Sequence, residues 1–171
     1  MKNSFSNIDC TINSREVIER IGELESDLQD LKDTIEVISE KIVEKESELE
    51  EAMQDDESIS LRGSIAAELV DLKIGQEDKI QEATEWRTSG DGDELGVLRN
   101  LAEQCEGVDD WEYGVQLIRD SYFEQAMDEM VAGCYKPPKD LPFWMTITYD
   151  YDALKQDYNS VDFDGETYWV R

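Results

Sequence analysis

The sequence has no histidine, only three cysteines and three prolines, and only 16 basic residues among 171. Without histidine, the chain lacks the commonest general base and the commonest metal ligand. Cys10, Cys105 and Cys134 lie far apart, so they form neither a zinc-binding pair nor a disulfide framework. Glycine-rich phosphate loops and Ser/His/Asp triads are also missing. We therefore predict that the protein is not an enzyme and uses no cofactor and no metal ion.

Long apolar runs are missing too. No segment approaches the ~20 consecutive apolar residues of a membrane span, and the first ten residues, MKNSFSNIDC, lack the apolar stretch of a signal peptide. These features predict a cytoplasmic protein with reduced thiols and no membrane partner. A hydrophobic content of 39% in 171 residues is enough for one domain, or for a small domain with an extended element.

The charge balance is heavily one-sided. The chain carries 43 acidic residues against 16 basic ones, which gives a net charge of −27. Such an excess repels itself and opposes compaction, so it needs an explanation. Nucleic acid and anionic membranes are poor partners for this surface, whereas basic proteins and divalent cations are natural ones. We expect no direct binding of nucleic acid.

Apolar residues recur every three or four positions from Ser14 to about Met53, a pattern typical of about five coiled-coil heptads. One seam position is occupied throughout by apolar residues, namely Ile21, Leu28, Ile35, Ile42 and Leu49. The other seam position weakens at Lys45 and Ala52. Ser14 suits the start of this helix as an N-cap.

Residues 55–58 break the pattern, and a second helix is expected from about Ser58 to Trp86 with an interruption at Gly75. A short connection between two long helices favours an antiparallel arrangement, so residues 14–87 are predicted to form a coiled-coil helical hairpin. The sequence leaves open whether the hairpin closes within one chain or whether two copies pair through the first helix as a homodimer.

Residues 1–13 are expected to be a loose lead and residues 88–92 (TSGDG) a linker, after which an acidic α+β domain spans residues 93–171. The predicted elements of this domain are helices over residues 95–105, 115–132 and 150–158, and strands over residues 160–163 and 166–170. Asp164–Gly165 between the two strands is a strong β-hairpin signal. The predicted fold class is therefore mostly α: a long N-terminal coiled-coil helical hairpin followed by a small α+β C-terminal domain with a terminal β-hairpin.

Acidic residues form two stripes at spacing four along the predicted helices. The stripes are Glu36, Glu40, Glu44 and Glu48 in the first helix, and Asp120, Glu124 and Asp128 in the helix over residues 115–132. Like charges at this spacing face each other and cost a few tenths of a kcal/mol per pair. A basic partner explains such a placement better than solubility alone, and a solvated face of an acidic protein is the alternative interpretation.

The net charge is −12 over residues 14–57, −2 over residues 58–88 and −13 over residues 89–171. Duplex DNA carries one charge per ~1.7 Å of its axis, so a hairpin roughly 60 Å long would have to match about 35 charges. The hairpin falls short of that density, whereas residues 89–171 hold their charge in a smaller body. They are the better candidate for imitating DNA.

Three C-terminal stretches carry a family resemblance. They are LIRDSYFEQAMDEM (residues 117–130), YDYDALKQDY (149–158) and SVDFDGETYWVR (160–171). An acidic helix, a Tyr-Asp-Tyr segment, an amphipathic helix closed by Asp157, and an Asp-Gly hairpin ending in Arg171 follow one another. In this pattern the segment resembles the end of the ArdA antirestriction proteins, and of acidic phage proteins that share this tail.

The resemblance implies a phage or mobile-element protein that acts in the host cytoplasm and whose acidic surface imitates B-form DNA. ArdA proteins occupy the DNA groove of type I restriction–modification enzymes and are commonly dimers. The N-terminal part of that family is not recognisable here, because the helical hairpin stands in its place. The expected partner is therefore a basic DNA-binding host defence protein, either a restriction–modification enzyme or another such enzyme, including a CRISPR effector.

The predicted binding surface consists of acidic side chains that each act as a charge, with no single one essential. Its members are Asp109, Asp110, Asp120, Glu124, Asp128, Asp150, Asp152, Asp157, Asp162 and Asp164, with Glu36, Glu40, Glu44 and Glu48 in support. The alternative hypothesis is a coiled-coil structural or adaptor protein, in which the hairpin is the interface and the acidity serves solubility only.

Overall fold

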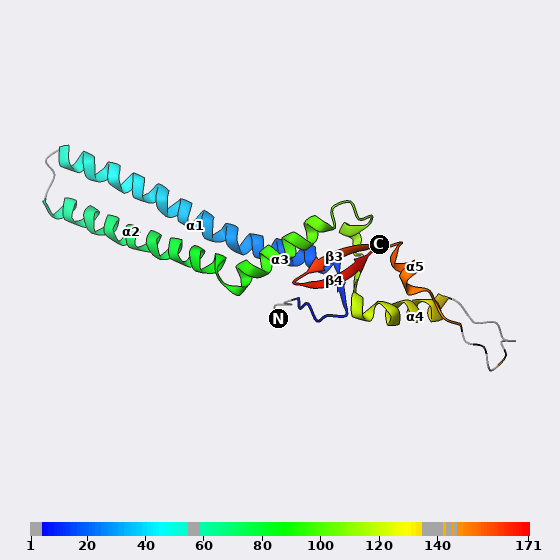
Figure 1. Ribbon diagram of the computed structural model, residues 1–171. Coiled ribbons are helices and arrows are strands. Elements are labelled where there is room, and N and C mark those ends of the chain that lie inside the picture. Colours follow the sequence, from blue (N-terminus) through cyan, green and yellow to red (C-terminus); the bar gives the residue numbers. More distant parts are fainter. Residues whose placement is uncertain (1–4, 55–58, 135–141, 143–144, 146) are drawn as a thin grey trace. The chain divides into compact units, whose positions relative to one another are not determined.

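The computed structural model describes residues 5–54, 59–134, 142, 145 and 147–171 (Figure 1). The chain divides into two compact units. The sheet unit consists of Met1–Gly22 together with Gly96–Arg171, and the hairpin unit is Glu23–Leu95. None of the helices in the described ranges is long and apolar enough to cross a bilayer.

Two long helices form the hairpin unit, as expected. Helix α1 (Ser14–Gln54) begins at the predicted residue, and helix α2 (Ile59–Arg87) follows it. The predicted break at residues 55–58 lies outside the described residues. The seam is only partly closed, because most of its apolar residues are half-buried. Its buried members are Leu24, Ile42, Ala52 and Ala83.

Polar contacts between α1 and α2 close the hairpin within one chain. The Gln76 amide donates to the Ser39 hydroxyl at 2.6 Å. The Lys45 ammonium lies 3.2 Å from Glu68, and the Lys73 ammonium lies 2.7 Å from Glu46. Ser39 contacts Gln76, whereas Lys45 and Glu46, which lie further along α1, contact the earlier α2 residues Glu68 and Lys73, so the two helices are antiparallel.

The interruption predicted at Gly75 does not occur, since α2 runs through it without a break. The neighbouring Gln76 instead supplies the contact to α1. The predicted linker over residues 88–92 is also shorter in the structure, because helix α3 (Gly90–Gln104) starts inside it. Gly92 permits the tight turn between α2 and α3: a Cβ atom there would lie 2.4 Å from the Arg87 carbonyl oxygen.

A four-stranded antiparallel sheet organises the sheet unit, in the order β1-β2-β4-β3. The strands are β1 (Thr11–Asn13), β2 (Gln116–Arg119), β3 (Asn159–Phe163) and β4 (Glu166–Val170). The predicted terminal β-hairpin is confirmed. Asp164 and Gly165 have φ angles of 50° and 82°, as a two-residue type I′ turn requires.

Short helical elements complete the sheet unit (Figure 1). They are the 3₁₀ turns η1 (Trp111–Tyr113) and η2 (Asp120–Tyr122) and the helices α4 (Phe123–Cys134) and α5 (Tyr151–Lys155). One face of the sheet buries Leu117, Val161 and Tyr168. Val161 and Tyr168 are paired across β3 and β4, and Leu117 lies two residues before Arg119, which is the partner of Tyr168 in β2. The opposite face presents Ile118 to Phe123 and Met127 of α4.

The helix predicted over residues 115–132 is wrong in its first third. Leu117 and Ile118 lie in β2, and α4 starts only at Phe123. Both residues are buried. Because adjacent residues of a strand point to opposite faces, the two side chains pack on opposite sides of the sheet. Pairing with β1 on one side and β4 on the other overrides the local helical pattern.

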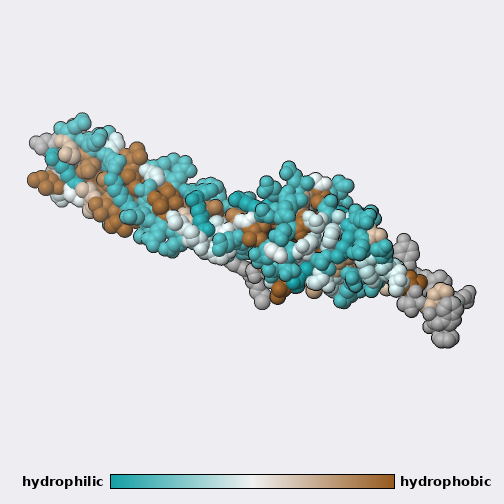
Figure 2. Space-filling view, viewed as in Figure 1, coloured by the Kyte–Doolittle hydropathy of each residue, from teal (hydrophilic) through white to brown (hydrophobic). Residues whose placement is uncertain are grey.

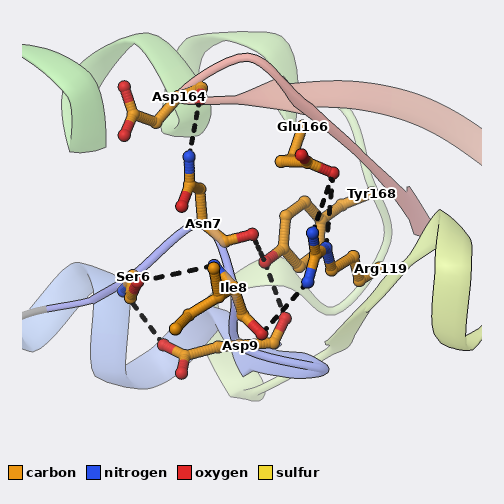
Figure 3. A network of polar contacts seen from close by, with 8 residues as sticks. All are labelled: Ser6, Asn7, Ile8, Asp9, Arg119, Asp164, Glu166 and Tyr168. Atoms are coloured by element: carbon orange, nitrogen blue, oxygen red, sulfur yellow. Dashed lines mark hydrogen bonds and ion pairs between the residues drawn. The ribbon is translucent and has the colours of Figure 1, made fainter.

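The loose lead predicted for residues 1–13 is not loose where the structure describes it. Residues 11–13 form β1, and the segment just before it is tied to the sheet (Figure 3). The Tyr168 hydroxyl donates to the carbonyl oxygens of Asp9 at 2.7 Å and Asn7 at 3.2 Å. Arg119 donates to the Ile8 carbonyl oxygen at 3.3 Å and pairs with Glu166 at 3.2 Å.

Ser14 fixes the start of α1 within the sheet unit. Its buried hydroxyl donates to the Trp111 carbonyl oxygen at 2.6 Å and accepts from the Val115 N–H at 2.8 Å. The capping role predicted for Ser14 falls instead to Asn13, whose side chain accepts from the Arg15 N–H at 2.9 Å.

Ser14→Ala is expected to lower the free energy of unfolding by about 1–3 kcal/mol, because it leaves buried backbone groups without their partner. Urea denaturation followed by circular dichroism measures this. Ser26→Ala, at an exposed position of the same helix, is the matched control and should change stability by less than about 0.5 kcal/mol. Equal losses in the two variants would contradict the role of Ser14.

Candidate functional site

The negative charge is unevenly divided between the two units. The hairpin unit holds 24 acids and 7 bases, a net −17, and the sheet unit holds 19 acids and 9 bases, a net −10. Two acids of the predicted C-terminal domain, Asp93 and Glu94, lie in the hairpin unit, as does Asp91 of the predicted linker. Each unit therefore carries an anionic surface of its own.

Helices α4 and α5 bring four of the predicted acids into one group. Glu124 and Asp128 occupy successive turns of α4 and are exposed. The Tyr151 hydroxyl, at the start of α5, donates to Asp128 at 2.6 Å and so joins the two helices. Asp150 and Asp152 flank that tyrosine. These four carboxylates, Glu124, Asp128, Asp150 and Asp152, are the α4–α5 acidic cluster.

The electrostatics of Tyr151 reflect this cluster. The hydrogen bond to Asp128, followed by burial and the charges of Asp128 and Glu124, raises the pKa of Tyr151 to about 12. The phenol therefore stays protonated at neutral pH, and Asp128 accepts a neutral donor that leaves its negative charge in place. Asp150 likewise keeps its charge, since its partner is the backbone N–H of Ala153 at 3.0 Å.

Asp120 is bound by other side chains of the protein, unlike most of the predicted acids. It lies in η2, outside α4, so a stripe of three acids along one helix does not form. Its carboxylate accepts from the Lys155 ammonium at 2.6 Å and from the Trp169 indole N–H at 2.7 Å. These bonds hold the pKa of Asp120 below its ordinary value.

Lys155 thus balances the charge of Asp120 and also packs against aromatic rings. Its ammonium lies 5.4 Å from the centroid of Phe123 and 5.1 Å from that of Trp169. The Asp120–Lys155 pair joins α5 to η2, and the Asp120–Trp169 bond joins η2 to β4. Through these two contacts Asp120 holds α5, which begins between Asp150 and Asp152 of the α4–α5 acidic cluster, against η2 and β4.

A second acidic group lies at the end of α3 and in the segment after it, and is named here the acidic loop. It comprises Glu103, Glu106, Asp109, Asp110 and Glu112, which line a hollow of about 640 Å³. The left-handed backbone at Gly107 and Asp110, with φ of 93° and 61°, turns the chain back on itself. Asp109 and Asp110 were predicted as site residues, and both are exposed.

Glu103 and Glu106 are missing from the predicted surface. Their spacing of three on the last turn before Gly107 is the sequence signal that could have identified them. The last turn of α3 contains no basic residue. Because a helix C-terminus carries partial negative charge, acids at this end are unfavourable for the helix itself.

The turn of the terminal hairpin presents Asp162 and Asp164, both exposed. Asp162 is fixed through its backbone: its N–H donates to the Gln104 side chain at 2.8 Å, and its carbonyl oxygen accepts from the same amide at 2.9 Å. The Asp164 carbonyl oxygen accepts from Asn7 at 3.0 Å (Figure 3). Asp157, another predicted residue, follows α5 and is exposed.

The stripe on α1 belongs to the hairpin unit. Glu36, Glu40 and Glu44 are exposed, whereas Glu48 is half-buried and pairs with Lys45 at 2.7 Å. The hydrogen bonds to Glu48 and Glu68 raise the pKa of Lys45. Glu48 is therefore neutralised locally, and three members of the stripe keep their charge.

Most of the predicted carboxylates form no hydrogen bond or ion pair with any residue that the structure describes. These are Glu36, Glu40, Glu44, Asp109, Asp110, Glu124, Asp152, Asp157 and Asp164. Despite this abundance, the described residues contain no group of three or more Cys, Asp or Glu side chains placed to hold a metal ion. The arrangement presents dispersed negative charge to solvent.

Asp120→Asn tests whether Lys155 and Trp169 stabilise the fold through this charge. Because the folded-state pKa of Asp120 is depressed, its contribution is present above the unfolded pKa, near 4, and is lost as pH falls through the folded value. We expect a loss of about 1 kcal/mol at pH 7, at the low end for a charged hydrogen bond because half of the Asp120 side chain is exposed. Urea titrations should show the gap closing as pH falls below the unfolded value. Asp109→Asn, which removes an exposed charge, should show no such pH-dependent gap.

The chain matches no family model, no curated protein and no solved structure. The resemblance of residues 117–171 to the ArdA proteins therefore stays a prediction.

Proposed function

We propose that the chain is an anti-defence protein of a phage or mobile element, which binds the basic DNA-binding surface of a host restriction–modification or CRISPR-type enzyme and inhibits it as an acidic DNA mimic. One observation carries this proposal: exposed carboxylates without cationic partners lie together on α4 and α5, and two of them, Asp128 and Asp150, are held in place by neutral donors. Such groups keep their full charge and their position, and these are the two properties that a substitute for backbone phosphates needs.

The α4–α5 acidic cluster illustrates this arrangement. A tyrosine hydroxyl holds Asp128 and a backbone N–H holds Asp150, so neither carboxylate is neutralised. The nearby lysine, Lys155, is directed to Asp120. A cationic protein surface approaching the cluster would therefore meet carboxylates that lack an internal counter-ion.

The placement of acids works against the stability of the helices. Glu36, Glu40 and Glu44 repel one another at spacing four. Helices α1, α3 and α4 have no basic residue in their last turn, where a cation would favour the helix dipole. Solubility alone does not require either arrangement, since acids could alternate with bases. A partner that supplies the missing positive charge accounts for both.

A second candidate function is a structural or adaptor protein that associates through the hairpin. The observation in its favour is a set of apolar side chains on the outside of the hairpin, including Val70 and Ile74, which are 55% and 54% exposed. This function predicts association that is insensitive to salt and is disrupted by polar substitution at Leu28 or Ile35.

The test begins with affinity capture from host lysate at low salt, followed by elution with duplex DNA. A captured DNA-binding enzyme is then assayed directly: the chain should displace labelled duplex from it, as measured by fluorescence anisotropy. Displacement should weaken steeply as salt rises, because the attraction is electrostatic. If duplex DNA releases no captured protein, DNA mimicry is contradicted.

Combined replacement of three charges tests which surface binds. Glu124→Gln, Asp128→Asn and Asp152→Asn together should weaken displacement roughly tenfold or more, since each removes an attraction and none removes a core side chain. The matched control changes net charge equally at exposed hairpin positions, through Asp27→Asn, Asp30→Asn and Glu51→Gln. Equal weakening in both triple variants would show that total charge, and not the α4–α5 acidic cluster, determines binding.

A further inference from the structure

The hollow of the acidic loop has an apolar floor beneath its carboxylates. Its volume of about 640 Å³ falls within the range of about 300–1,000 Å³ that is usual for sites holding small ligands. All of its lining residues lie between positions 102 and 113. Ala102, Cys105 and Val108 are the buried or half-buried members of this lining and form the floor, whereas the five acids are exposed and form the rim.

Cys105 places an unsatisfied polar atom in this floor. The residue is 1% exposed, and its thiol forms no hydrogen bond with any residue that the structure describes. Burial raises the pKa of the thiol to about 11, so it stays protonated and uncharged at neutral pH. Its sulfur is a weak acceptor that a ligand in the hollow can approach. The floor therefore carries no charge, and charge is confined to the rim.

Two aromatic side chains of η1, Trp111 and Tyr113, line the same hollow. Trp111 is half-buried and Tyr113 is 81% exposed, although the sheet unit is mostly hydrophilic on the face that Figure 2 shows. Within the described part of the chain, neither ring packs against another aromatic ring or a lysine. The face of an aromatic ring attracts cations, so both rings are available to a cationic ligand.

The charge of the segment also requires a cation. Residues 100–118 contain five acids and no base. The carboxylates of these acids form no ion pair or hydrogen bond with any described residue. Carboxylates alone would not distinguish this place in a chain with 43 acids. The hollow, the two rings and the unpartnered thiol do distinguish it, and they favour a cation that has an apolar stem and a flat head.

The hollow is formed before any ligand binds. The Ser14 hydroxyl donates to the Trp111 carbonyl oxygen at 2.6 Å and accepts from the Val115 N–H at 2.8 Å, which holds both ends of η1. Within the turn, the Tyr113 N–H donates to the Asp110 carbonyl oxygen at 2.9 Å. A site that is already ordered avoids most of the entropy cost of ordering a loop around its ligand.

We propose that this hollow is an anchor site for one arginine side chain of the basic partner, with the methylene stem on the floor and the guanidinium against Tyr113. A guanidinium stacks on a ring through its flat face while its N–H groups point outward in the same plane, toward carboxylates at the rim. A lysine ammonium is a compact, strongly hydrated charge and offers no such face. The inference rests on the proposed function, which supplies the basic partner.

The test is an NMR titration of the isotope-labelled full chain with the capped tripeptide Gly-Arg-Gly. Its matched controls are the same peptide with lysine, and with citrulline, which keeps the shape of arginine but has no charge. The arginine peptide should shift the amide signals of residues 102–113 and the indole signal of Trp111. The lysine peptide should bind about threefold more weakly. The citrulline peptide should leave these signals unchanged.

Variants at Tyr113 test the contribution of its ring. Tyr113→Ala should raise the dissociation constant of the arginine peptide about threefold, because the cation loses the aromatic face. Tyr113→Phe should retain the wild-type value, since the ring remains. Tyr113 is 81% exposed, so neither change removes a core side chain, and circular dichroism should show an unchanged fold.

Three results would overturn the proposal: shifts scattered over the acids of the whole chain, equal affinity for the lysine peptide, or an unchanged affinity in Tyr113→Ala. The titration needs no host enzyme, so it separates this inference from the proposed function. A chain that binds the arginine peptide in the hollow but displaces no duplex would contradict the proposed function alone. Displacement of duplex without binding of the peptide in the hollow would contradict the anchor site alone.

Discussion

Repulsion among 43 carboxylates, balanced by only 16 cations, is the constraint under which the rest of this structure forms. The described ion pairs show how the few cations are used. Lys45, Lys73, Arg119 and Lys155 each bridge elements that are distant in sequence. Two of these pairs hold the hairpin closed, and two hold the sheet unit together. These four cations thus connect elements, whereas Arg15 and Lys79 pair with acids of their own helices. Most of the carboxylates predicted for the binding surface have no cationic partner among the described residues.

Neutral donors hold the acidic segments where cations are lacking. Tyr151 fixes Asp128, and the Gln104 amide fixes the backbone of Asp162. Tyr168 fastens the segment before β1, and burial raises the pKa of its phenol to about 12, so it remains a donor at neutral pH. A hydrogen bond from a neutral group fixes the position of an acidic segment without cancelling its charge. Rigidity and negative charge therefore coexist on the surface of the sheet unit.

The hairpin separates two kinds of surface along its length. Helix α1 carries an acidic stripe of which Glu36, Glu40 and Glu44 remain unpaired within the described residues, whereas residues 59–74 of α2 are neutral and partly apolar. An apolar side chain buried against a partner contributes through the area removed from water, and this contribution survives high salt. A carboxylate contributes through long-range attraction, which salt screens. An association made through one surface would therefore respond to salt differently from an association made through the other.

The sequence by itself determined the elements that rest on local patterns. The heptad of α1, its start at Ser14, and the Asp164–Gly165 turn between β3 and β4 follow from periodicity and turn chemistry, which neighbouring residues decide. The strand identity of residues 11–13 and of β2 depended on partners more than 100 residues away, and no local signal encodes such pairing. The same holds for the site: exposure of the acids followed from composition, but only the tertiary structure brought Lys155 and Trp169 to Asp120 and Tyr151 to Asp128. Which carboxylates keep their charge depends on contacts between distant segments, because a neutralising cation acts over a few ångströms of space and not along the chain.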